Sequence, residues 1–480
     1  MNKSDSERVQ TVLEEMGFRW TDAEDQANLL GILACSVRQK AIDKVYSKIH
    51  TWNKAKNSRN LLTFVSGCLL PTDKFKFLKL FDLVFTMDEL TDVPDMIKQY
   101  GVVTPVSLKG PDNAASAIIP VSRTDHSNGF PSLLELLQKK DSIRLIHSGE
   151  SGLDDPENRS IMDGFWHIHP HYSSSFEAFV PIQNGCDKFC TFCAVPYTRG
   201  REVSRPSSEI LNEIQGLIDR NYKSITLLGQ NVNSYGLDKP GNEISFSNLL
   251  EEIGEMGMRS GKTFWVYFTS PHPRDMSRDV IDAVSRYDCI AKQIHLPLQS
   301  GDDKVLIRMN RKHSLEKYRE IVQYIRTTIP EATLFTDIIV GFTGETDDQF
   351  ENTRKAVREF EYNMAYIAIY SPRPGAVSAR WQDDVPHALK KERLHTLTRD
   401  LEQQSRQYTK RMIGGTFPVL ITGQDRKKKY LAGYTEGRIN VRIPSNDLKL
   451  IGQIIDIKIK SATDFSVEGE MEFQTHKKAQ

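Results

Sequence analysis

Three of the six cysteines in this 480-residue chain crowd into one short stretch, which reads Gly185-Cys186-Asp187-Lys188-Phe189-Cys190-Thr191-Phe192-Cys193. Their spacing is C-x-x-x-C-x-x-C. Three thiolates can hold three irons of a 4Fe–4S cube and leave the fourth iron open, and an open metal position indicates chemistry rather than structure. The stretch therefore predicts a catalytic iron–sulfur centre with Cys186, Cys190 and Cys193 as its ligands.

Two other interpretations of these cysteines are weaker. A structural zinc ion would need a fourth ligand, which the histidine-rich stretch 165–171 could supply, but such sites usually pair their ligands in two short hooks. Disulfides do not suit three clustered cysteines, because the remaining ones are scattered at Cys35, Cys68 and Cys289. Few cysteines in a long chain also fit a reducing compartment.

Residues 176–400 alternate between short apolar runs and amphipathic stretches, which predicts strands and helices in turn. A helix is expected at 208–214, and the expected strands are 178–182, 224–229, 263–268, 293–297, 334–341 and 364–370. Repeated βα units in one domain imply a parallel sheet, either open or closed into a barrel. The cysteine loop follows the first of these strands.

Three further motifs with ligand-binding groups follow strands of the same region. They contain Gly229, Gln230 and Asn231 after one strand, Gln299 and Ser300 after another, and Gly341 after a third. Amides and hydroxyls suit a zwitterion or a ribose, and a glycine lets the backbone approach a ligand. Each motif alone could be an ordinary turn. Together with the cysteine loop, they indicate a site on the C-terminal rim of the sheet.

Residues 1–102 have the pattern of a βαβ unit. An amphipathic helix opens at Asp5, one apolar run ends at Cys35, Ser36 caps a second helix, and another apolar run ends at Cys68. Parallel strands place both cysteines at the C-terminal edge of a sheet, where α/β proteins build sites. Two ordinary buried thiols are the alternative.

The rest of the chain divides into two different parts. Residues 103–175 predict a loop-rich insertion or linker with one helix near 132–137. Residues 408–472 predict a small antiparallel barrel, because short turns separate the β-rich runs 417–422, 430–434, 438–443 and 453–459. A hairpin of this barrel carries Arg426-Lys427-Lys428-Lys429, which suits RNA phosphates, although a solvated charged loop is the alternative.

The whole chain is electrically balanced, with 63 Lys and Arg against 63 Asp and Glu, so any surface for nucleic acid must be local. No apolar run reaches the ~20 residues that a membrane helix needs. The polar N-terminus also lacks a signal-peptide core. We expect a cytoplasmic protein with no membrane partner.

The stretch from Gly185 to Pro206 resembles the radical S-adenosylmethionine (SAM) core of the methylthiotransferases. Within that family, similarity is greatest to the enzymes that act on N(6)-isopentenyladenosine of tRNA. The stretches that carry this similarity are 35–41, 194–200, 227–235 and 370–375. The resemblance covers nearly the whole chain except 103–175, which is longer than is usual in the family.

The resemblance implies a flavodoxin-like N-terminal domain, a partial (β/α) radical-SAM barrel and a C-terminal RNA-binding TRAM barrel. It implies a radical-SAM 4Fe–4S cluster on Cys186, Cys190 and Cys193, an auxiliary 4Fe–4S cluster with Cys35 and Cys68 as ligands, and a SAM pocket with Gly229, Gln230, Asn231, Gln299, Ser300 and Gly341. Cleavage of SAM would give a 5′-deoxyadenosyl radical that removes hydrogen from C2 of the adenine. The auxiliary cluster would deliver sulfur, and a second SAM would supply the methyl group. Expected partners are tRNA, a one-electron donor such as flavodoxin or ferredoxin, and a sulfur donor, for a chain that acts as a monomer.

The sequence departs from the family pattern near its start. The family's third auxiliary ligand would fall immediately upstream of Met1, and Leu33-Ala34 stand where the family usually has Asn-Thr. Either the chain is truncated, or the protein has lost this ligand. We favour truncation, because losing a first central strand would leave a sheet edge exposed. An in-frame Gly-Cys upstream of Met1 in the gene is the expected observation.

Two other functions remain open. The same chemistry could act on threonylcarbamoyladenosine of tRNA or on an aspartate of a ribosomal protein, although the motifs 195–199 and 371–373 argue against both. An inactive iron–sulfur or zinc RNA-binding protein is the alternative from another class. It predicts no 5′-deoxyadenosine when the protein meets SAM and a strong reductant.

Overall fold

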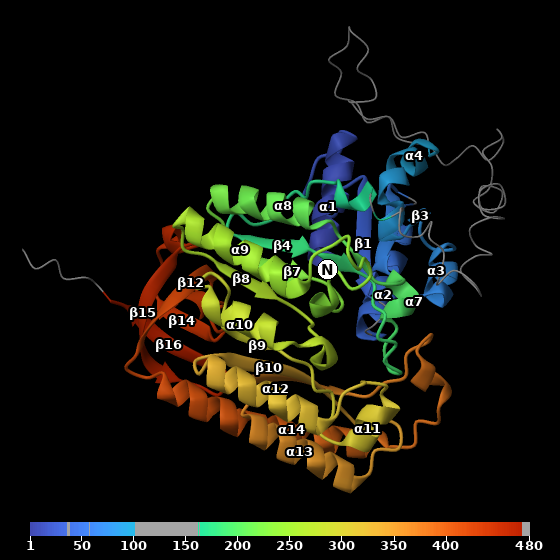
Figure 1. Ribbon diagram of the computed structural model, residues 1–480. Helices are drawn as coiled ribbons and strands as arrows, with labels where there is room; N and C mark the ends of the chain where they lie inside the picture. The colour runs from blue at the N-terminus through green and yellow to red at the C-terminus, as the bar shows by residue number, and fades with distance from the viewer. Residues whose placement is uncertain (36–38, 57, 101–161, 163, 473–480) are drawn as a thin grey trace, which may run out of the picture. The chain divides into compact units, whose positions relative to one another are not determined.

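The computed structural model describes residues 1–35, 39–56, 58–100, 162 and 164–472, which form two compact units (Figure 1). The first unit is drawn from Met1–Ser173, Asn184–Asp187 and Ala194–Val203, and the second from Ser174–Gln183, Lys188–Cys193 and Ser204–Gln480. Among the described residues, no helix combines the length and apolar character needed to cross a membrane.

A three-stranded parallel sheet organises the first unit (Figure 1). Its strands are β1 (Leu29–Cys35), β2 (Leu62–Cys68) and β3 (Leu83–Val84), in that order. Helix α2 (Gln39–Ala55) connects β1 to β2 and completes the expected βαβ unit. Cys35 lies opposite Cys68 in the register, so the prediction that both end neighbouring parallel strands is confirmed. The predicted cap at Ser36 lies outside the described residues.

The two faces of this sheet bury different cores. The other elements of the unit are α1 (Asn2–Glu15), α3 (Pro71–Phe77), the 3₁₀ helix η1 (Met87–Asp92) and α4 (Val93–Lys98). Phe64 packs with residues of α1, η1 and α4, whereas its neighbour Val65 packs with residues of α2 and α3, as the alternation of a strand requires. Phe165 and Trp166, from the end of the expected linker, are buried in the first of these cores. The expected helix near 132–137 lies outside the described residues.

All six strands expected in the central region form, and they run parallel in an arc. They are β4 (Glu177–Pro181), β7 (Ser224–Leu228), β8 (Trp265–Phe268), β9 (Gln293–His295), β10 (Thr333–Val340) and β11 (Met364–Ile369). They make two three-stranded sheets, β4-β7-β8 and β11-β10-β9, which a bridge between Val266 and Ile290 connects. The arc is the partial (β/α) barrel that the sequence predicts.

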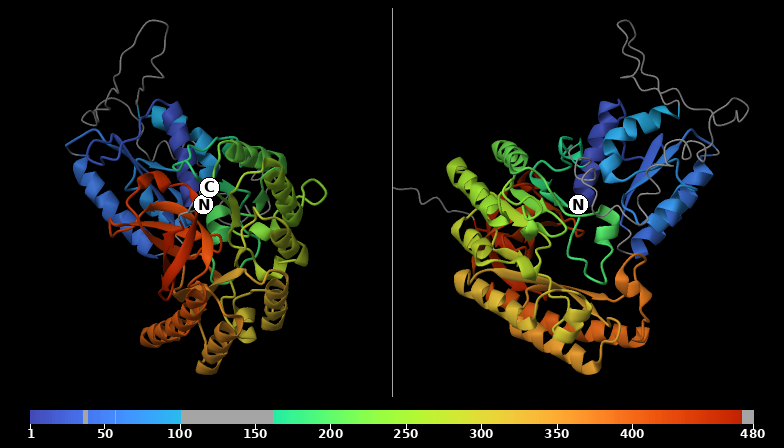
Figure 2. Two further views of the ribbon diagram at one scale, coloured as in Figure 1. Left: turned by 90° about the vertical axis from the view of Figure 1, so that its left-hand side faces the viewer. Right: turned by 45° about the vertical axis from the view of Figure 1, so that its right-hand side comes forward.

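Helices that lie between these strands in the sequence, together with one helix that follows the last strand, cover the outer side of the arc (Figures 1 and 2). They are α8 (Ser207–Asp219), α9 (Phe246–Ser260), α10 (Arg278–Arg286), α11 (Asp303–Arg308), α12 (Leu315–Thr328), α13 (Asp347–Phe360) and α14 (His387–Arg411). Ser245, Ser277 and Ser314 precede α9, α10 and α12, and each hydroxyl accepts a hydrogen bond from a backbone N–H of the first turn. These caps explain where the helices begin.

The C-terminal residues form a closed five-stranded barrel. Its strands are β12 (Thr416–Gln424), β13 (Tyr430–Thr435), β14 (Asn440–Pro444), β15 (Ile454–Ala462) and β16 (Ser466–Met471). The expected barrel is confirmed, with two differences. β16 was not among the expected strands, and it pairs parallel to β14, so the barrel is not purely antiparallel. Closure requires a strand between β14 and β15, and this tertiary pairing prevails over weak local β propensity.

The turn between β13 and β14 fastens this barrel to the arc within the second unit. The Arg438 guanidinium lies 3.8 Å from the ring centre of Tyr267 and 4.2 Å from that of Tyr434. The Tyr434 hydroxyl donates to Glu177 Oε1 at 2.7 Å, and Thr333 Oγ1 donates to the carbonyl oxygen of Gly437 at 2.8 Å. Glu177 and Thr333 begin their strands, so the turn contacts the N-terminal ends of the arc.

Candidate functional site

The C-terminal ends of the arc strands carry the motifs singled out in the sequence. The cysteine loop follows β4, residues 229–231 follow β7, residues 299 and 300 come after β9, and Gly341 follows β10. Because neighbouring strands run in the same direction, these segments lie along one rim. The structure therefore brings the predicted segments of the second unit together.

The first half of the cysteine loop belongs to the first unit and depends on a glycine. Gly185 has a φ of 80°, and a Cβ there would lie 1.9 Å from the carbonyl oxygen of Arg201, so only glycine fits. The backbone N–H of Cys186 donates to the carbonyl oxygen of Gly200 at 3.3 Å. The segment that follows α7 (Val195–Arg199) thus fixes the backbone at Cys186.

The second half of the loop is held by the segment after α11. The N–H of Cys193 donates to the carbonyl oxygen of Cys190 at 3.0 Å. Phe189 has a φ of 48°, and its carbonyl oxygen accepts from Asn310 Nδ2 at 2.9 Å. The buried Arg311 donates from Nη1 to Cys190 Sγ at 3.5 Å. Its positive charge complements the negative charge that a metal-bound thiolate carries.

A network of charged and amide side chains lines the rim beside the second half of the cysteine loop. Lys188 Nζ lies 2.6 Å from Asp275 Oδ2, and both side chains are 10% exposed. Asn231 Nδ2 donates to the same carboxylate at 3.0 Å and to Ser234 Oγ at 2.7 Å. Gln183 Nε2 also donates to Ser234 Oγ, at 3.1 Å. The amide nitrogens are therefore used within the protein.

Several buried polar atoms of the rim have no hydrogen-bond partner among the described residues. They are Gln183 Oε1, Gln230 Oε1, Asn231 Oδ1, His272 Nε2 and His313 Nε2. Leaving such an atom unpaired costs about 1–3 kcal/mol, so a group of them indicates where a polar ligand completes the bonds. The residues present thus suit a ligand with amine, carboxylate and hydroxyl groups.

Sequence reasoning missed the two histidines of this group. His272 Nδ1 accepts from the N–H of Arg274 at 3.1 Å, and the rings of His272 and His313 are 5.7 Å apart. Burial lowers the pKa of both rings, with Arg311 adding to the effect, and it brings the pKa of His313 to about 4. Both imidazoles are therefore neutral near pH 7. The available signal was Ser270-Pro271-His272-Pro273, which follows an expected strand as the other rim motifs do.

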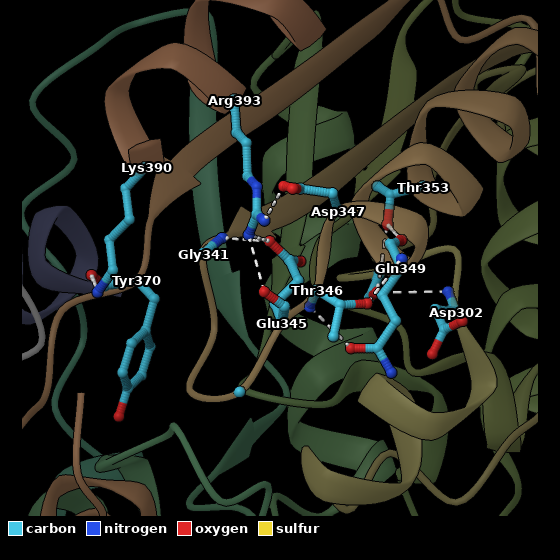
Figure 3. A network of polar contacts seen from close by, with 12 residues as sticks. Asp302, Gly341, Glu345, Thr346, Asp347, Gln349, Thr353, Tyr370, Lys390 and Arg393 are labelled. Carbon is cyan, nitrogen blue, oxygen red and sulfur yellow. Dashed lines mark hydrogen bonds and ion pairs between the residues drawn. The ribbon is translucent and has the colours of Figure 1, made fainter. Parts of the chain in front are cut away.

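A buried ion pair holds the loop after β10 (Figure 3). The N–H of Gly341, whose φ is 69°, donates to Glu345 Oε2 at 2.7 Å. Arg393 of α14 donates to the same oxygen at 2.8 Å, and the two side chains are 3% and 1% exposed. Arg393 also reaches Asp347 at 2.7 Å. A Cβ on Gly341 would lie 2.3 Å from Lys390 Cγ, so the glycine backbone is closely confined.

Gln299 and Ser300 are held in different ways. Gln299 has a φ of 73°, and its N–H donates to the carbonyl oxygen of Asp337 at 2.8 Å, which extends the sheet beyond β9. Ser300 is fully buried, and its hydroxyl lies 3.3 Å from Thr353 Oγ1. The Ser300 hydroxyl thus has a partner inside the protein. Assignment of SAM to these residues stays a prediction.

Cys35 and Cys68 end their strands beside a buried arginine of the same unit. Arg199 Nε donates to Cys68 Sγ at 2.8 Å, and Arg199 Nη2 pairs with Asp5 Oδ2 at 2.5 Å. The Arg199 and Asp5 side chains are 5% and 0% exposed. Burial raises the pKa of the Cys68 thiol, and Arg199 opposes that shift. The structure thus places a cation beside the Cys68 thiol, and the role of Cys68 as a cluster ligand stays a prediction.

The donor set suits iron–sulfur clusters, because thiolates are the ligands that such clusters take from proteins. All six cysteines lie in the described part of the chain, and none of them is disulfide-bonded. In that same part, the structure gathers no three His, Cys, Asp or Glu side chains into a group that could hold a metal ion. Assignment of cysteines as ligands therefore rests on their chemistry and spacing, and it stays a prediction.

Three family models match segments of the chain. Residues 180–357 match the Radical SAM superfamily, residues 1–87 match the Uncharacterized protein family UPF0004, and residues 410–471 match the TRAM domain. Among solved structures, the radical S-adenosylmethionine methyltransferase TsrM from Kitasatospora setae has a TM-score of 0.50 at 11% identity, covering 87% of this chain and 70% of that one. That likeness concerns the fold alone. The parallel arc with a three-cysteine loop after its first strand defines a radical SAM enzyme.

Two curated relatives identify the family. A tRNA-2-methylthio-N(6)-dimethylallyladenosine synthase of Clostridium botulinum strain Hall is 35% identical, over 98% of this chain and 94% of that protein. The synthase of the same name from Bacillus subtilis strain 168 is 33% identical, over 98% of this chain and 84% of that protein. The chain belongs to the family of tRNA-2-methylthio-N(6)-dimethylallyladenosine synthases, which confirms the resemblance seen in the sequence.

Proposed function

We propose that this protein is a radical SAM methylthiotransferase that converts N(6)-isopentenyladenosine next to the anticodon of tRNA to its 2-methylthio derivative. One observation carries the proposal. The loop from Cys186 to Cys193 follows the first strand of a parallel arc, in a chain that is 35% identical to such a synthase over 98% of its length.

Within this proposal, Cys186, Cys190 and Cys193 would hold a 4Fe–4S cluster. When bound, this cluster supplies the electron that cleaves SAM reductively. Arg311 donates a hydrogen bond to Cys190 and steadies that ligand. The protein does the rest by positioning, because the loop backbone is held on both sides of the cysteines.

SAM lies along the rim in this proposal. The unpaired oxygens of Gln230 and Asn231 accept hydrogen bonds from its amine or ribose. Gly229, Gln299, Ser300 and Gly341 complete the pocket through backbone atoms and the Gln299 amide. The ion pair behind Gly341 keeps the rim loop fixed when the ligand enters.

Cys35 and Cys68 would supply two ligands of an auxiliary 4Fe–4S cluster, and the chemistry which that cluster would supply when bound is sulfur donation. Their strands end at the same edge of the sheet, which supports a shared role. The Arg199 guanidinium beside Cys68 supplies a donor for a sulfur that carries negative charge.

The C-terminal barrel binds tRNA in this proposal. Arg426 to Lys429 are exposed between β12 and β13, where they can reach RNA phosphates. We also infer a one-electron donor such as flavodoxin or ferredoxin, a separate sulfur donor, and a monomer that acts in the cytoplasm.

The test expresses the full chain in a bacterial strain that lacks 2-methylthio-N(6)-isopentenyladenosine but makes its precursor. Mass spectrometry of tRNA nucleosides should detect the 2-methylthio product. Cys193→Ala should abolish both this product and 5′-deoxyadenosine formation by the reconstituted protein, whereas Cys289→Ala, outside the loop, should retain both. A wild-type chain that cleaves SAM but leaves the precursor unchanged would contradict the substrate, and one that makes no 5′-deoxyadenosine would contradict the enzyme class.

A further inference from the structure

One face of the sheet β11-β10-β9 is less buried than the other, although Ile339 on that face packs against a buried cluster of Val305, Met309, Phe342 and Tyr370. Residues of β10 alternate, with Thr336, Ile338 and Val340 fully buried and Asp337 and Ile339 only half-buried. Helix α14 lies against β10 and β11 on the outer side of the arc (Figure 1). The less buried residues therefore point into the arc, on the side away from the helices.

Three polar or aromatic side chains gather on this inner face. Asp337 lies directly opposite Tyr366 in the register. His295 Nε2 lies 2.8 Å from Asp337 Oδ2, and the His295 and Tyr366 rings are 5.7 Å apart at 59°. Tyr366 is 55% exposed, and the Asp337 side chain is 36% exposed. A half-exposed aromatic ring beside an accessible carboxylate contributes little to the fold, so both groups are available to a ligand.

The next register pair on the same face is apolar. Ile339 lies opposite Ala368, and Ala368 is exposed. Residues two apart on a strand are separated by about 7 Å. The apolar pair therefore lies about 7 Å from Asp337, which is about the length of a short alkyl group. The Ala368 side chain is a single methyl group. The inner face thus presents an aromatic ring beside a hydrogen-bond acceptor, followed along the strands by the apolar pair Ile339 and Ala368.

An adenine alkylated at N6 has the complementary features. Its flat ring stacks on an aromatic side chain, as single bases do in RNA-binding proteins. Its N6 atom keeps one N–H group, which can donate a hydrogen bond. An ionised Asp side chain only accepts hydrogen bonds, so it is a suitable partner for this N–H. Its alkyl chain is apolar. A threonylcarbamoyl substituent instead carries a carboxylate, which the Asp337 charge would repel.

We propose that this inner face is the nucleobase subsite, in which Tyr366 stacks on the adenine, Asp337 accepts the N6 hydrogen, and Ile339 with Ala368 contacts the isopentenyl chain. The His295 ring lies beside the Asp337 carboxylate. The inference deepens the proposed function and rests on it for the identity of the base. It assigns the choice among N6 substituents to residues of β10 and β11.

The test measures binding rather than turnover. Anticodon stem-loop RNAs that carry adenosine, N(6)-isopentenyladenosine or N(6)-threonylcarbamoyladenosine at the same position are titrated against the full chain. Wild type should bind the isopentenyl RNA about tenfold more tightly than the unmodified RNA. Tyr366→Ala should weaken binding of the isopentenyl RNA about tenfold, whereas Tyr366→Phe should retain it. Phe75→Ala is the matched control, because Phe75 is 56% exposed in the first unit.

Two substitutions test selectivity directly. Ala368→Leu places a larger side chain where the isopentenyl chain is proposed to lie. The preference for isopentenyl over unmodified RNA should therefore disappear, while unmodified RNA should still bind. Asp337→Asn removes the charge at constant shape, so the threonylcarbamoyl RNA should gain affinity relative to the isopentenyl RNA. Equal binding of all three RNAs by wild type, or unchanged preferences in both variants, would overturn the proposal. Failure of the proposed function differs from this result, because it would show as missing 2-methylthio product in a protein that still selects the isopentenyl RNA.

Discussion

Removal of the buried guanidinium of Arg393 tests how the rim loop after β10 is held. Arg393→Met keeps an apolar stem of similar length but leaves the Glu345 carboxylate, which is 1% exposed, without its cation. Breaking a buried pair in this way costs about 3–5 kcal/mol of unfolding free energy. The contact with Asp347, which is 86% exposed, adds little to that figure. We therefore expect a loss of about 3–5 kcal/mol, nearly all of it from the stranded carboxylate.

The stability of this variant should depend on pH in one definite direction. Burial raises the pKa of Glu345, while the Gly341 N–H and Arg393 oppose the shift. Without Arg393, the folded-state pKa rises further above the unfolded value, so the folded protein binds the proton more strongly than the unfolded chain does. The variant should therefore gain stability relative to wild type as the pH falls, and its deficit should be larger at pH 8 than at pH 5.

Urea unfolding at both pH values, followed by tryptophan fluorescence and circular dichroism, measures these losses. Arg319→Met is the matched control, because Arg319 is 29% exposed and its partners Glu316 and Glu359 lie at the surface. That variant should lose less than about 1 kcal/mol. Combining Glu345→Gln with Arg393→Met should recover part of the loss, since no charge is then stranded. A loss below about 1 kcal/mol in Arg393→Met, or a deficit independent of pH, would refute the argument.

Three further outcomes are expected. Gly185→Ala should lower the unfolding temperature more than Gly200→Ala, because both glycines have positive φ but only the Cβ at Gly185 meets a backbone atom, the carbonyl oxygen of Arg201 at 1.9 Å; equal shifts would contradict the clash. Arg438→Ala should cost about 2 kcal/mol in urea unfolding, because it removes cation–π contacts with two buried tyrosine rings, and Arg438→Lys should cost less; equal losses would argue against stacking. Because the folded-state pKa of His313 is about 4, below the unfolded value, its contribution to stability is present above about pH 6.5 and is lost as the pH falls towards 4. His313→Asn should flatten the pH–stability profile in that window, and an unchanged profile would refute this assignment.

The arc strands and the cysteine loop could be predicted because their signals are local. Each strand is a short apolar run bounded by turn residues, and all six expected runs overlap a strand of the structure. The spacing of three thiols within a few residues needs no knowledge of the fold. Parallel direction then follows from the helices between the strands, so the rim position of the motifs could also be predicted.

Contacts between distant residues could not be predicted in the same way. Arg311 reaches Cys190 across 121 positions, and Arg199 reaches Cys68 across 131 positions. The sequence does not distinguish either arginine from an arginine at the surface, because the packing of other elements decides whether the side chain is buried and which groups it contacts. β16 escaped prediction for a related reason, since its glycine and glutamates have weak β propensity and only β14 and β15 make it a strand.

The strand order of the C-terminal barrel bears on the synthesis of the protein. β16 lies between β14 and β15, so the barrel cannot close until residue 471 has left the ribosome. Until then β14 and β15 each expose an unpaired edge, which another chain could extend. β15 ends at residue 462, and at roughly 5–20 residues per second the remaining stretch takes about a second to make. The exposed interval is short, and the barrel assigned to RNA is the last part of the described chain that can complete its fold.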